Sequence, residues 1–279
     1  MADVTQPDVG GAIDGRGSRL VGLTALVTGA GGSGEILGCG QAIAQLFAAQ
    51  GATVGVLDIE PERVKHTTDL IDAAGGRPFP LIADITDEAA VGTAVEALAR
   101  EAAGIDIVVN NAAITGGAEP VLGTAVSAWE RTVSVNVTGA MLVSRTAHPY
   151  LAMSPTASIV NISSVAANRG GGVGAYAASK GAIQSMTKDL AYAWGPSGIR
   201  INCIAPGYIH ATMSGRMTET ARLQREEGTL LGTEGGAWDI AWAALFLASP
   251  ESRWLTGVIL PVDGGASATT AVAMARRAT

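Results

Sequence analysis

A phenol and an ammonium group stand four residues apart at Tyr176 and Lys180. In a helix, side chains at this spacing project from one face. A nearby cation stabilises a phenolate and lowers the tyrosine pKa toward working pH, which suits a general acid or base. The same spacing is also common on solvated helix faces, so other residues must decide between the two interpretations.

A glycine-rich segment, residues 28–40, lies between a predicted strand and a predicted helix. Missing side chains let backbone N–H groups approach a pyrophosphate at a helix N-terminus. The pattern G-x-G-x-x-G fits from Gly29, whereas Gly38 and Gly40 directly precede the apolar helical run. A helix that began earlier would contain both of these glycines, each costing up to about 1 kcal/mol relative to alanine. We therefore place Gly38 and Gly40 at the phosphate turn and residues 30–37 in an enlarged loop.

Asp58 ends the next predicted strand, twenty residues after Gly38. A carboxylate at this place can hold both ribose hydroxyls of a dinucleotide. It also repels a 2′-phosphate, and residues 30–37 contain no Lys or Arg to receive one. NAD is therefore favoured over NADP. The alternative is that Asp58 only initiates a turn before Glu60 and Pro61.

Short apolar runs alternate with amphipathic stretches along most of the chain, a pattern that predicts a parallel sheet covered by helices. The predicted strands are 24–28, 53–58, 80–84, 105–110, 157–162, 199–204 and 257–262. The predicted helices are 41–50, 62–74, 89–102, 129–150 and 175–194. Residues 107–109 and 159–160 are apolar on both faces, which suits central strands. The fold class is therefore α/β, a Rossmann-type doubly wound parallel sheet in a single domain.

Composition excludes several classes of protein. Of the 279 residues, 48% are hydrophobic and 15% are charged, which excludes a disordered chain. A net charge of -7 opposes binding to nucleic acid and to anionic membrane surfaces. Two cysteines, Cys39 and Cys203, are too few for a disulfide framework and indicate no metal site. We expect a cytoplasmic protein with a small-molecule substrate and without nucleic-acid, membrane or metal partners.

Several motifs occur together with the Tyr-x-x-x-Lys stretch, and with them the chain resembles the classical short-chain dehydrogenase/reductase family over residues 20–265. The motifs are Thr28-Gly29, Asn110-Asn111-Ala112-Ala113, Asn136, Ser164, Tyr176-x-x-x-Lys180 and Pro206-Gly207.

The resemblance implies a role for each catalytic residue. Tyr176 would be the general acid/base that exchanges a proton with the substrate oxygen. Lys180 would bind the nicotinamide ribose and lower the tyrosine pKa, and Asn136 would help to hold a water that relays protons from Lys180. Ser164 would donate a hydrogen bond to the substrate oxygen. Ser163 lies at the usual family spacing from Tyr176, but Ser164 aligns better with the strand end.

The resemblance also implies how the cofactor is bound. The implied cofactor-binding residues are Gly29, Gly38, Gly40, Asp58, Asp84, Ile85, Asn111, Ala112, Tyr176, Lys180, Pro206, Gly207 and Ile209. Among them, Asp84 and Ile85 would flank the adenine, and Ile209 would lie near the nicotinamide carboxamide. From the residues alone, Asp84 could equally cap the helix that follows it. The strand motif at 256–265 often lies at a tetramer interface in the family, which implies a homotetramer.

These residues predict an NAD-dependent oxidoreductase that interconverts a secondary alcohol and a ketone. We expect a flexible arm over 1–19, the dehydrogenase domain over 20–265 with a helical substrate lid at about 208–232, and a tail over 266–279. Met213 and Met217 could form an apolar pocket wall in the lid. Two alternatives remain: a 3-oxoacyl reductase of the same family, or a dinucleotide-sensing module without turnover.

Overall fold

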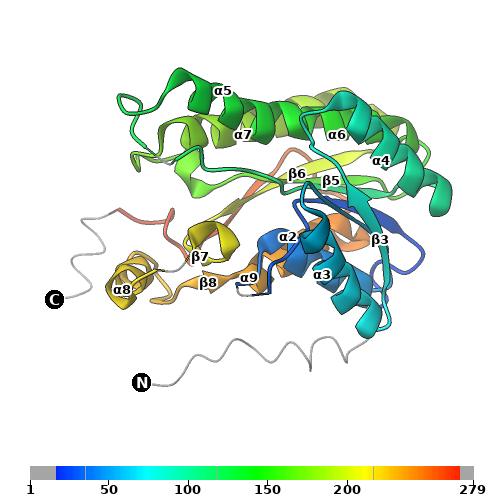
Figure 1. Ribbon diagram of the computed structural model, residues 1–279, viewed down its shortest axis with the longest axis horizontal. Helices are drawn as coiled ribbons and strands as arrows, with labels where there is room; N and C mark the ends of the chain where they lie inside the picture. The colour runs from blue at the N-terminus through cyan, green and yellow to red at the C-terminus, as the bar shows by residue number, and fades with distance from the viewer. Residues whose placement is uncertain (1–16, 35, 118, 216, 271–279) are drawn as a thin grey trace.

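The computed structural model describes residues 17–34, 36–117, 119–215 and 217–270. Its centre is a sheet of seven parallel strands in the order β3-β2-β1-β4-β5-β6-β9 (Figure 1). The strands are β1 (Thr24–Thr28), β2 (Thr53–Asp58), β3 (Arg77–Ile82), β4 (Ile107–Asn110), β5 (Ser158–Ile162), β6 (Arg200–Pro206) and β9 (Ile259–Val262). The order reverses between β1 and β4, which makes this the predicted doubly wound sheet.

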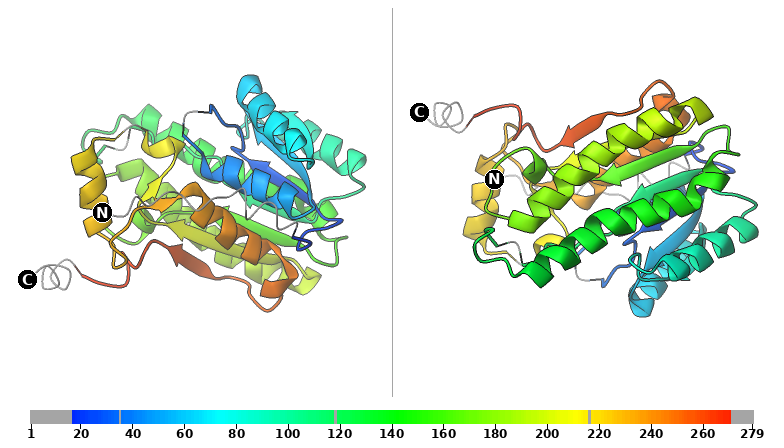
Figure 2. Two further views of the ribbon diagram at one scale, coloured as in Figure 1. Left: turned by 90° about the horizontal axis from the view of Figure 1, so that it is seen from below. Right: turned by 90° about the horizontal axis from the view of Figure 1, so that it is seen from above.

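Helices cover both faces of the sheet (Figures 1 and 2). One face carries α2 (Cys39–Ala49), α3 (Pro61–Ala73) and α9 (Ala237–Ala248), and α2 packs beside α9. The other face carries α4 (Glu88–Glu101), α5 (Val126–Val133), α6 (Ala140–Leu151) and α7 (Gly174–Trp194). A core lies on each side, because β1, β4 and β5 bury every residue. Central strands that are apolar on both faces thus fix the layered fold.

The longest predicted helix, 129–150, is interrupted in the structure. A π-helical turn, η1 (Ser134–Gly139), separates α5 from α6 and contains Asn136. Single π turns inside α-helices occur frequently at functional sites. The 3.6-residue pattern continues through such a turn, so apolar periodicity alone could not reveal it.

The structure differs from the predicted helices in two further respects, the residue that caps α4 and the presence of α9. The residue that caps α4 is Asp87, whose carboxylate accepts from the amides of Ala89 and Ala90, so the alternative interpretation of Asp84 as the cap is wrong. Helix α9 was not predicted, because residues 237–248 are apolar almost all round and lack a polar face.

Above the carboxyl ends of the strands, the chain after β6 forms a separate small layer. It contains β7 (Ile209–His210), α8 (Glu219–Glu227) and β8 (Gly235–Gly236), with β7 and β8 paired in parallel. The residues at about 208–232 that are expected to form a substrate lid lie in this segment, which continues to Gly236 and is called the lid below. Figure 1 shows α8 at the lower left of the molecule, next to β7 and β8.

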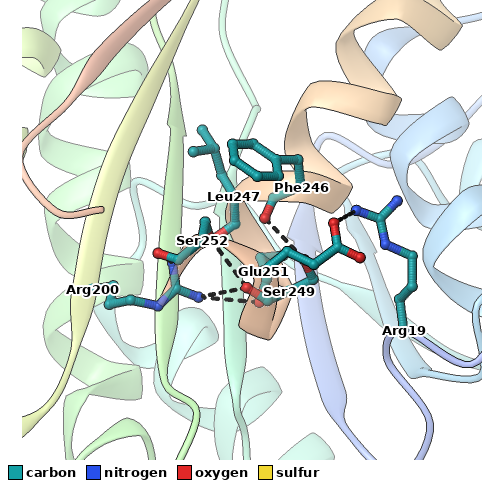
Figure 3. A network of polar contacts seen from close by, with 8 residues as sticks. Arg19, Arg200, Phe246, Leu247, Ser249, Glu251 and Ser252 are labelled. Atoms are coloured by element: carbon teal, nitrogen blue, oxygen red, sulfur yellow. Dashed lines mark hydrogen bonds and ion pairs between the residues drawn. The ribbon is translucent and has the colours of Figure 1, made fainter. Parts of the chain in front are cut away.

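The end of α9 is fastened to the start of β6 by Arg200 (Figure 3). Its guanidinium donates to the carbonyl oxygens of Leu247 at 2.8 Å and Ser249 at 3.3 Å, and to the Ser252 hydroxyl at 2.7 Å. The last carbonyls of a helix have no partner within it, and a cation there also complements the helix dipole. Nearby, Glu251 forms an ion pair with Arg19.

Most of the predicted arm, residues 1–16, and the last nine residues of the predicted tail lie outside the described residues. None of the helices in the described part of the chain combines the length and apolarity required to cross a bilayer.

Candidate active site

A cavity of about 1020 Å³ opens at the carboxyl ends of the strands, where ligands bind in open α/β sheets. All thirteen residues named above for cofactor binding line it, as does Ser164. Asn136 is 1% exposed and lies behind the wall. The structure therefore brings the residues of the motifs together in one place.

The glycine turn forms the floor of the cavity. Helix α2 begins at Cys39, with Gly38 as its N-cap, so the register that places Gly38 and Gly40 at the turn fits the observed helix start. Gly38 has no side chain to cap the first amides, and the first turn contains no acidic residue. A Cβ on Gly40 would lie 2.2 Å from the Gly29 carbonyl oxygen. Only glycine permits this close approach, and it leaves a helix N-terminus open to an anion.

Asn111 and Thr28 hold this turn against the end of β4. The Asn111 side chain donates to the carbonyl oxygens of Thr28 and Gly29, each at 3.0 Å. The Thr28 hydroxyl accepts from the amides of Asn111 and Ala112, each at 3.1 Å. These bonds fix the backbone that faces the cavity, so Asn111 acts by positioning the turn.

Asp58 stands at the end of β2 with its carboxylate against the enlarged loop. It accepts from the Gly31 amide at 3.1 Å and from the Glu60 amide at 3.2 Å. A carboxylate has about four acceptor positions, so capacity for two ribose hydroxyls remains. Arg63 of α3 also lines the cavity here. It lies against the enlarged loop, because a Cβ added to Gly31 would be 2.6 Å from the Cβ of Arg63. Arg63 lies outside residues 30–37, the loop whose lack of Lys and Arg favours NAD, and no local pattern in the sequence indicates that it reaches the cavity.

Asp84 lies two residues beyond the end of β3. Its carboxylate accepts from the amide and the hydroxyl of Thr86, at 2.9 and 2.7 Å, and is 3.4 Å from the Arg131 guanidinium. Burial by itself raises the pKa of Asp84, but these hydrogen bonds and the arginine lower it below its ordinary value. The carboxylate is therefore charged at neutral pH.

Tyr176 and Ser164 both line the cavity. Burial raises the pKa of the Tyr176 phenol, and a hydrogen bond between its side chain and that of Ser164 opposes this rise. The Ser164 oxygen accepts from the Ala166 amide at 3.1 Å, which fixes the oxygen and leaves the hydroxyl proton to be donated. Ser163 instead donates to the carbonyl oxygen of Lys180, at 2.7 Å. Of the two serines, Ser164 has the hydroxyl beside the phenol.

Lys180 is buried beside the same phenol. Its Nζ donates to the Ile162 carbonyl oxygen at 2.8 Å and lies 5.7 Å from the centre of the Tyr176 ring. Burial lowers the pKa of Lys180 to about 8, so the ammonium form predominates at neutral pH. Cys39 lies near it and lines the cavity, but burial raises the pKa of this thiol to about 12. The Cys39 thiol is therefore protonated and does not act as a nucleophile.

Asn136 reaches the site through its neighbours. Its side-chain oxygen accepts from the Ile114 amide at 2.8 Å. Its side-chain nitrogen donates to the Ile114 carbonyl oxygen and to the Ser179 hydroxyl, each at 2.9 Å. Both amide hydrogens are therefore used, and the side chain joins the π-helical turn to the loop after β4 and to helix α7.

The chain after β6 closes the far side of the cavity. Pro206 and Gly207 line it, and the carbonyl oxygen of Ile209 accepts from Arg225 at 3.1 Å. The Thr212 hydroxyl donates to the carbonyl oxygen of Ile36 at 2.6 Å, so the lid touches the enlarged glycine loop. Two lid methionines, Met213 and Met217, also line the cavity, whereas Leu223 is half exposed.

In the described part of the chain, no group of three or more His, Cys, Asp or Glu side chains is placed to hold a metal ion. The open glycine turn, the strand-end carboxylate and the buried Tyr-Lys pair instead fit a dinucleotide with a substrate beside it. Together with the sheet, they define a dinucleotide-dependent oxidoreductase of the Rossmann type.

Comparison with known proteins identifies the family. A sequence model for proteins described as Enoyl-(Acyl carrier protein) reductase matches residues 34–267. The 3-oxoacyl-(acyl-carrier-protein) reductase FabG of Thermotoga maritima is 35% identical over 248 residues, covering 88% of this chain and 98% of that protein. Galactitol 2-dehydrogenase (L-tagatose-forming) of Cereibacter sphaeroides is 37% identical over 252 residues, covering 88% and 96%. The chain belongs to the short-chain dehydrogenase/reductase family.

A solved structure supports the same assignment. The 7α-hydroxysteroid dehydrogenase complexed with NADH and 7-oxo glycochenodeoxycholic acid superposes with a TM-score of 0.83 at 33% sequence identity. The match covers 90% of this chain and 96% of that one. The protein is thus an oxidoreductase that binds a nicotinamide dinucleotide.

Proposed function

We propose that the protein is an NAD-dependent oxidoreductase that interconverts a secondary alcohol and a ketone. The observation that carries this proposal is that Tyr176, Ser164 and the buried Lys180 line the same cavity as the open start of α2, with the Lys180 Nζ 5.7 Å from the centre of the Tyr176 ring. Two hydroxyls that line one cavity can share a substrate oxygen, one as donor and one as proton acceptor. A small-molecule alcohol or ketone supplies such an oxygen.

Bound NAD or its reduced form would accept or return the hydride. The backbone amides at the start of α2 would hold its phosphates, and Asp58 would accept from the adenosine ribose hydroxyls. Asp84 and Ile85 would lie against the adenine. Lys180 would donate to the nicotinamide ribose, for which its ammonium form is suited.

The chain's own residues would move the proton. In alcohol oxidation, Ser164 donates a hydrogen bond to the substrate oxygen while Tyr176 takes the hydroxyl proton. The ammonium of Lys180 stabilises the phenolate form of Tyr176. Both amide hydrogens of the Asn136 side chain are used, so this residue would hold a relay water through an oxygen that accepts a hydrogen bond from it.

The choice of NAD rests on the carboxylate of Asp58, which repels a 2′-phosphate. Arg63 provides the specific argument for the second candidate, a 3-oxoacyl reductase that uses NADP. Its guanidinium comes from α3 beside Asp58 and could receive a phosphate once the carboxylate is displaced. The negative net charge of the chain opposes docking of an acidic carrier protein and favours the first candidate.

The same proposal includes assembly into a homotetramer in the cytoplasm. Two aromatic side chains are almost fully exposed on the described surface, Trp254 at 91% and Tyr192 at 87%. Exposed aromatic residues are enriched at protein interfaces. Sedimentation equilibrium of the purified protein measures the number of copies directly.

The deciding assay follows the absorbance of reduced nicotinamide with NAD or NADP and a panel of secondary alcohols and matching ketones. Turnover with NAD and weak turnover with NADP is the expected result. Turnover restricted to NADP and acyl thioesters would favour the second candidate. Measurable NAD binding without turnover of any compound would favour a dinucleotide-sensing module.

A further inference from the structure

The carboxylates that line the cavity, among the described residues, lie at one of its ends. The carboxylates among the lining residues are Asp58 and Asp84, both at the end where the adenosine half of the cofactor would lie. At the opposite end, beside the lid, the described lining contains two arginines, Arg169 and Arg225, and no carboxylate. The charged side chains that line the substrate end, among the described residues, are therefore cations.

Arg225 is committed to holding the lid. Its guanidinium lies 2.8 Å from Glu234, whose side chain is 2% exposed, and it donates to the Ile209 carbonyl oxygen at 3.1 Å. Glu234 is shared with Arg222, 3.1 Å away on its other oxygen. One buried carboxylate thus forms ion pairs with two arginines, and Arg225 is held in place by it.

Arg169 has no carboxylate within ion-pair distance among the described residues. It follows Ser164 in the loop before α7, is half-buried and donates a long hydrogen bond of 3.3 Å to the Ala266 carbonyl oxygen. Its guanidinium carbon lies 5.1 Å from the centre of the Tyr208 ring, and that of Arg225 lies 5.5 Å from the same ring. Stacking and one weak bond orient Arg169 and leave most of its donors unused.

A partly buried guanidinium near a second one, without a counter-ion, is unfavourable unless a ligand supplies the negative charge. We propose that Arg169 binds a carboxylate of the substrate at a point remote from the reacting carbon. The substrate class is then a hydroxy acid and the corresponding oxo acid. A planar guanidinium matches a carboxylate by paired hydrogen bonds, whereas Ser164 and Tyr176 take the reacting oxygen. This inference rests on the proposed function for the position of the reacting oxygen.

The test uses a series of straight-chain oxo acids that differ in the number of carbons between the ketone and the carboxyl group. Each acid is compared with its methyl ester. The wild type should have the larger kcat/KM for the acid at the best chain length. Arg169→Gln should reduce the ratio of acid to ester about ten- to a hundredfold and leave the ester almost unchanged, because one charge-assisted bond is lost. Arg169→Lys should restore part of the preference, and salt should weaken it.

Arg131→Gln is the matched control, since Arg131 lines the same cavity but pairs with Asp84 at the adenosine end. It should leave the ratio of acid to ester unchanged even where it alters the KM for the cofactor. An equal ratio in the wild type and Arg169→Gln, with turnover intact, would overturn the inference and leave the proposed function standing.

A second measurement needs no turnover. Calorimetric titration of the hydroxy acid and its methyl ester into protein saturated with NADH, a combination that cannot react, should show tighter binding of the acid, lost in Arg169→Gln and kept in Arg131→Gln. Binding that depends on Arg169 without turnover of any ketone would refute the proposed function and support the anion site. Equal binding of acid and ester in all three proteins would refute the anion site. Thermal unfolding of each variant checks that it is folded.

Discussion

Ser163 donates from its hydroxyl to the backbone carbonyl oxygen of Lys180 at 2.7 Å, and Lys180 returns a bond from Nζ to the Ile162 carbonyl oxygen at 2.8 Å. These reciprocal bonds fasten the end of β5 to the middle of α7. Ser163 therefore points into the protein and Ser164, the next residue, points into the cavity. The two serines that the sequence leaves as alternatives have separate tasks.

Ser164→Ala should lower kcat about a hundredfold, because a donor to the substrate oxygen is lost. It should also move the alkaline rise of kcat/KM for alcohol oxidation to higher pH. The sign follows from Tyr176, since the bond from Ser164 lowers the pKa of the phenol and its removal raises it. The measurement is the pH profile of kcat/KM.

Ser163→Ala provides the comparison for that profile. It removes the bond to the Lys180 carbonyl and should lower the free energy of unfolding by about 1 kcal/mol, with little change in the pH profile. A shifted profile in Ser163→Ala and an unshifted one in Ser164→Ala would reverse the two assignments.

Tyr176→Phe should reduce kcat by about a hundredfold to ten-thousandfold and leave the Kd for NAD nearly unchanged. It removes the transferable proton and little of the contact surface. Tyr192→Phe is the control, because Tyr192 lies in the same helix but is 87% exposed. Steady-state kinetics and fluorescence titration with NAD measure the two effects, and substantial activity in Tyr176→Phe would contradict the acid/base role.

Asp58→Ala should narrow the preference for NAD over NADP by about tenfold or more, because it removes both the acceptor for the ribose hydroxyls and the charge that repels a 2′-phosphate. Arg63, which lines the cavity beside it, should then increase the affinity for NADP further. The readout is the ratio of kcat/KM for the two cofactors. Asp72→Ala, an exposed change in α3, should leave this ratio as it is, and an unchanged ratio in Asp58→Ala would place ribose recognition elsewhere.

The local parts of this site could be predicted because their cause is local. Glycine costs stability inside a helix, so Gly38 and Gly40 indicate that α2 starts near them; the structure begins the helix at Cys39, two residues before the predicted start, with Gly40 in its first turn. The position of Asp58 could be predicted because it ends a strand and lies twenty residues after Gly38. The sheet follows from alternating patterns, because each pattern is decided by the residues within it.

The parts that could not be predicted depend on which distant segments meet. Arg63 reaches the cavity from α3, and Arg169 is distinguished only by the absence of a carboxylate near it in the described structure. The hydrogen bonds of Asn136 run to Ile114 and Ser179, which lie on other elements. Asp87 outcompetes Asp84 as the cap of α4 because it lies directly before the helix, whereas Asp84 bonds to Thr86.

A further prediction concerns Arg200, which binds the carbonyl oxygens at the end of α9, outside the active-site cavity. Arg200→Met leaves the carbonyls at the end of α9 and the Ser252 hydroxyl without their charged donor, so it should lower the free energy of unfolding by about 2 to 4 kcal/mol. Chemical denaturation measures this difference, and kcat/KM at a permissive temperature should not change. Arg253→Met, at an exposed position nearby, should change stability by about 0.5 kcal/mol or less. Equal effects of the two substitutions would show that the α9 carbonyls do not depend on Arg200.

Lys180 predicts a dependence of stability on pH. Burial lowers its pKa from the ordinary 10.5 to about 8, so between these values the unfolded chain binds the proton and the folded chain does not. Stability contributed by this group therefore rises with pH across that window and is constant below it.

Comparison with Lys180→Met isolates this effect. The free energy of unfolding of Lys180→Met, relative to that of the wild type, should be highest at neutral pH. This difference should fall by a few kcal/mol as the pH approaches 10.5, because the wild type gains stability over that range. Cys39 and Cys203, whose pKa values burial raises to about 12 and about 11, act with the opposite sign at alkaline pH. Because both thiols are present in both proteins, they largely cancel in the difference. Denaturation curves at stepped pH give the difference, and a constant value would mean that Lys180 keeps its ordinary pKa in the folded protein.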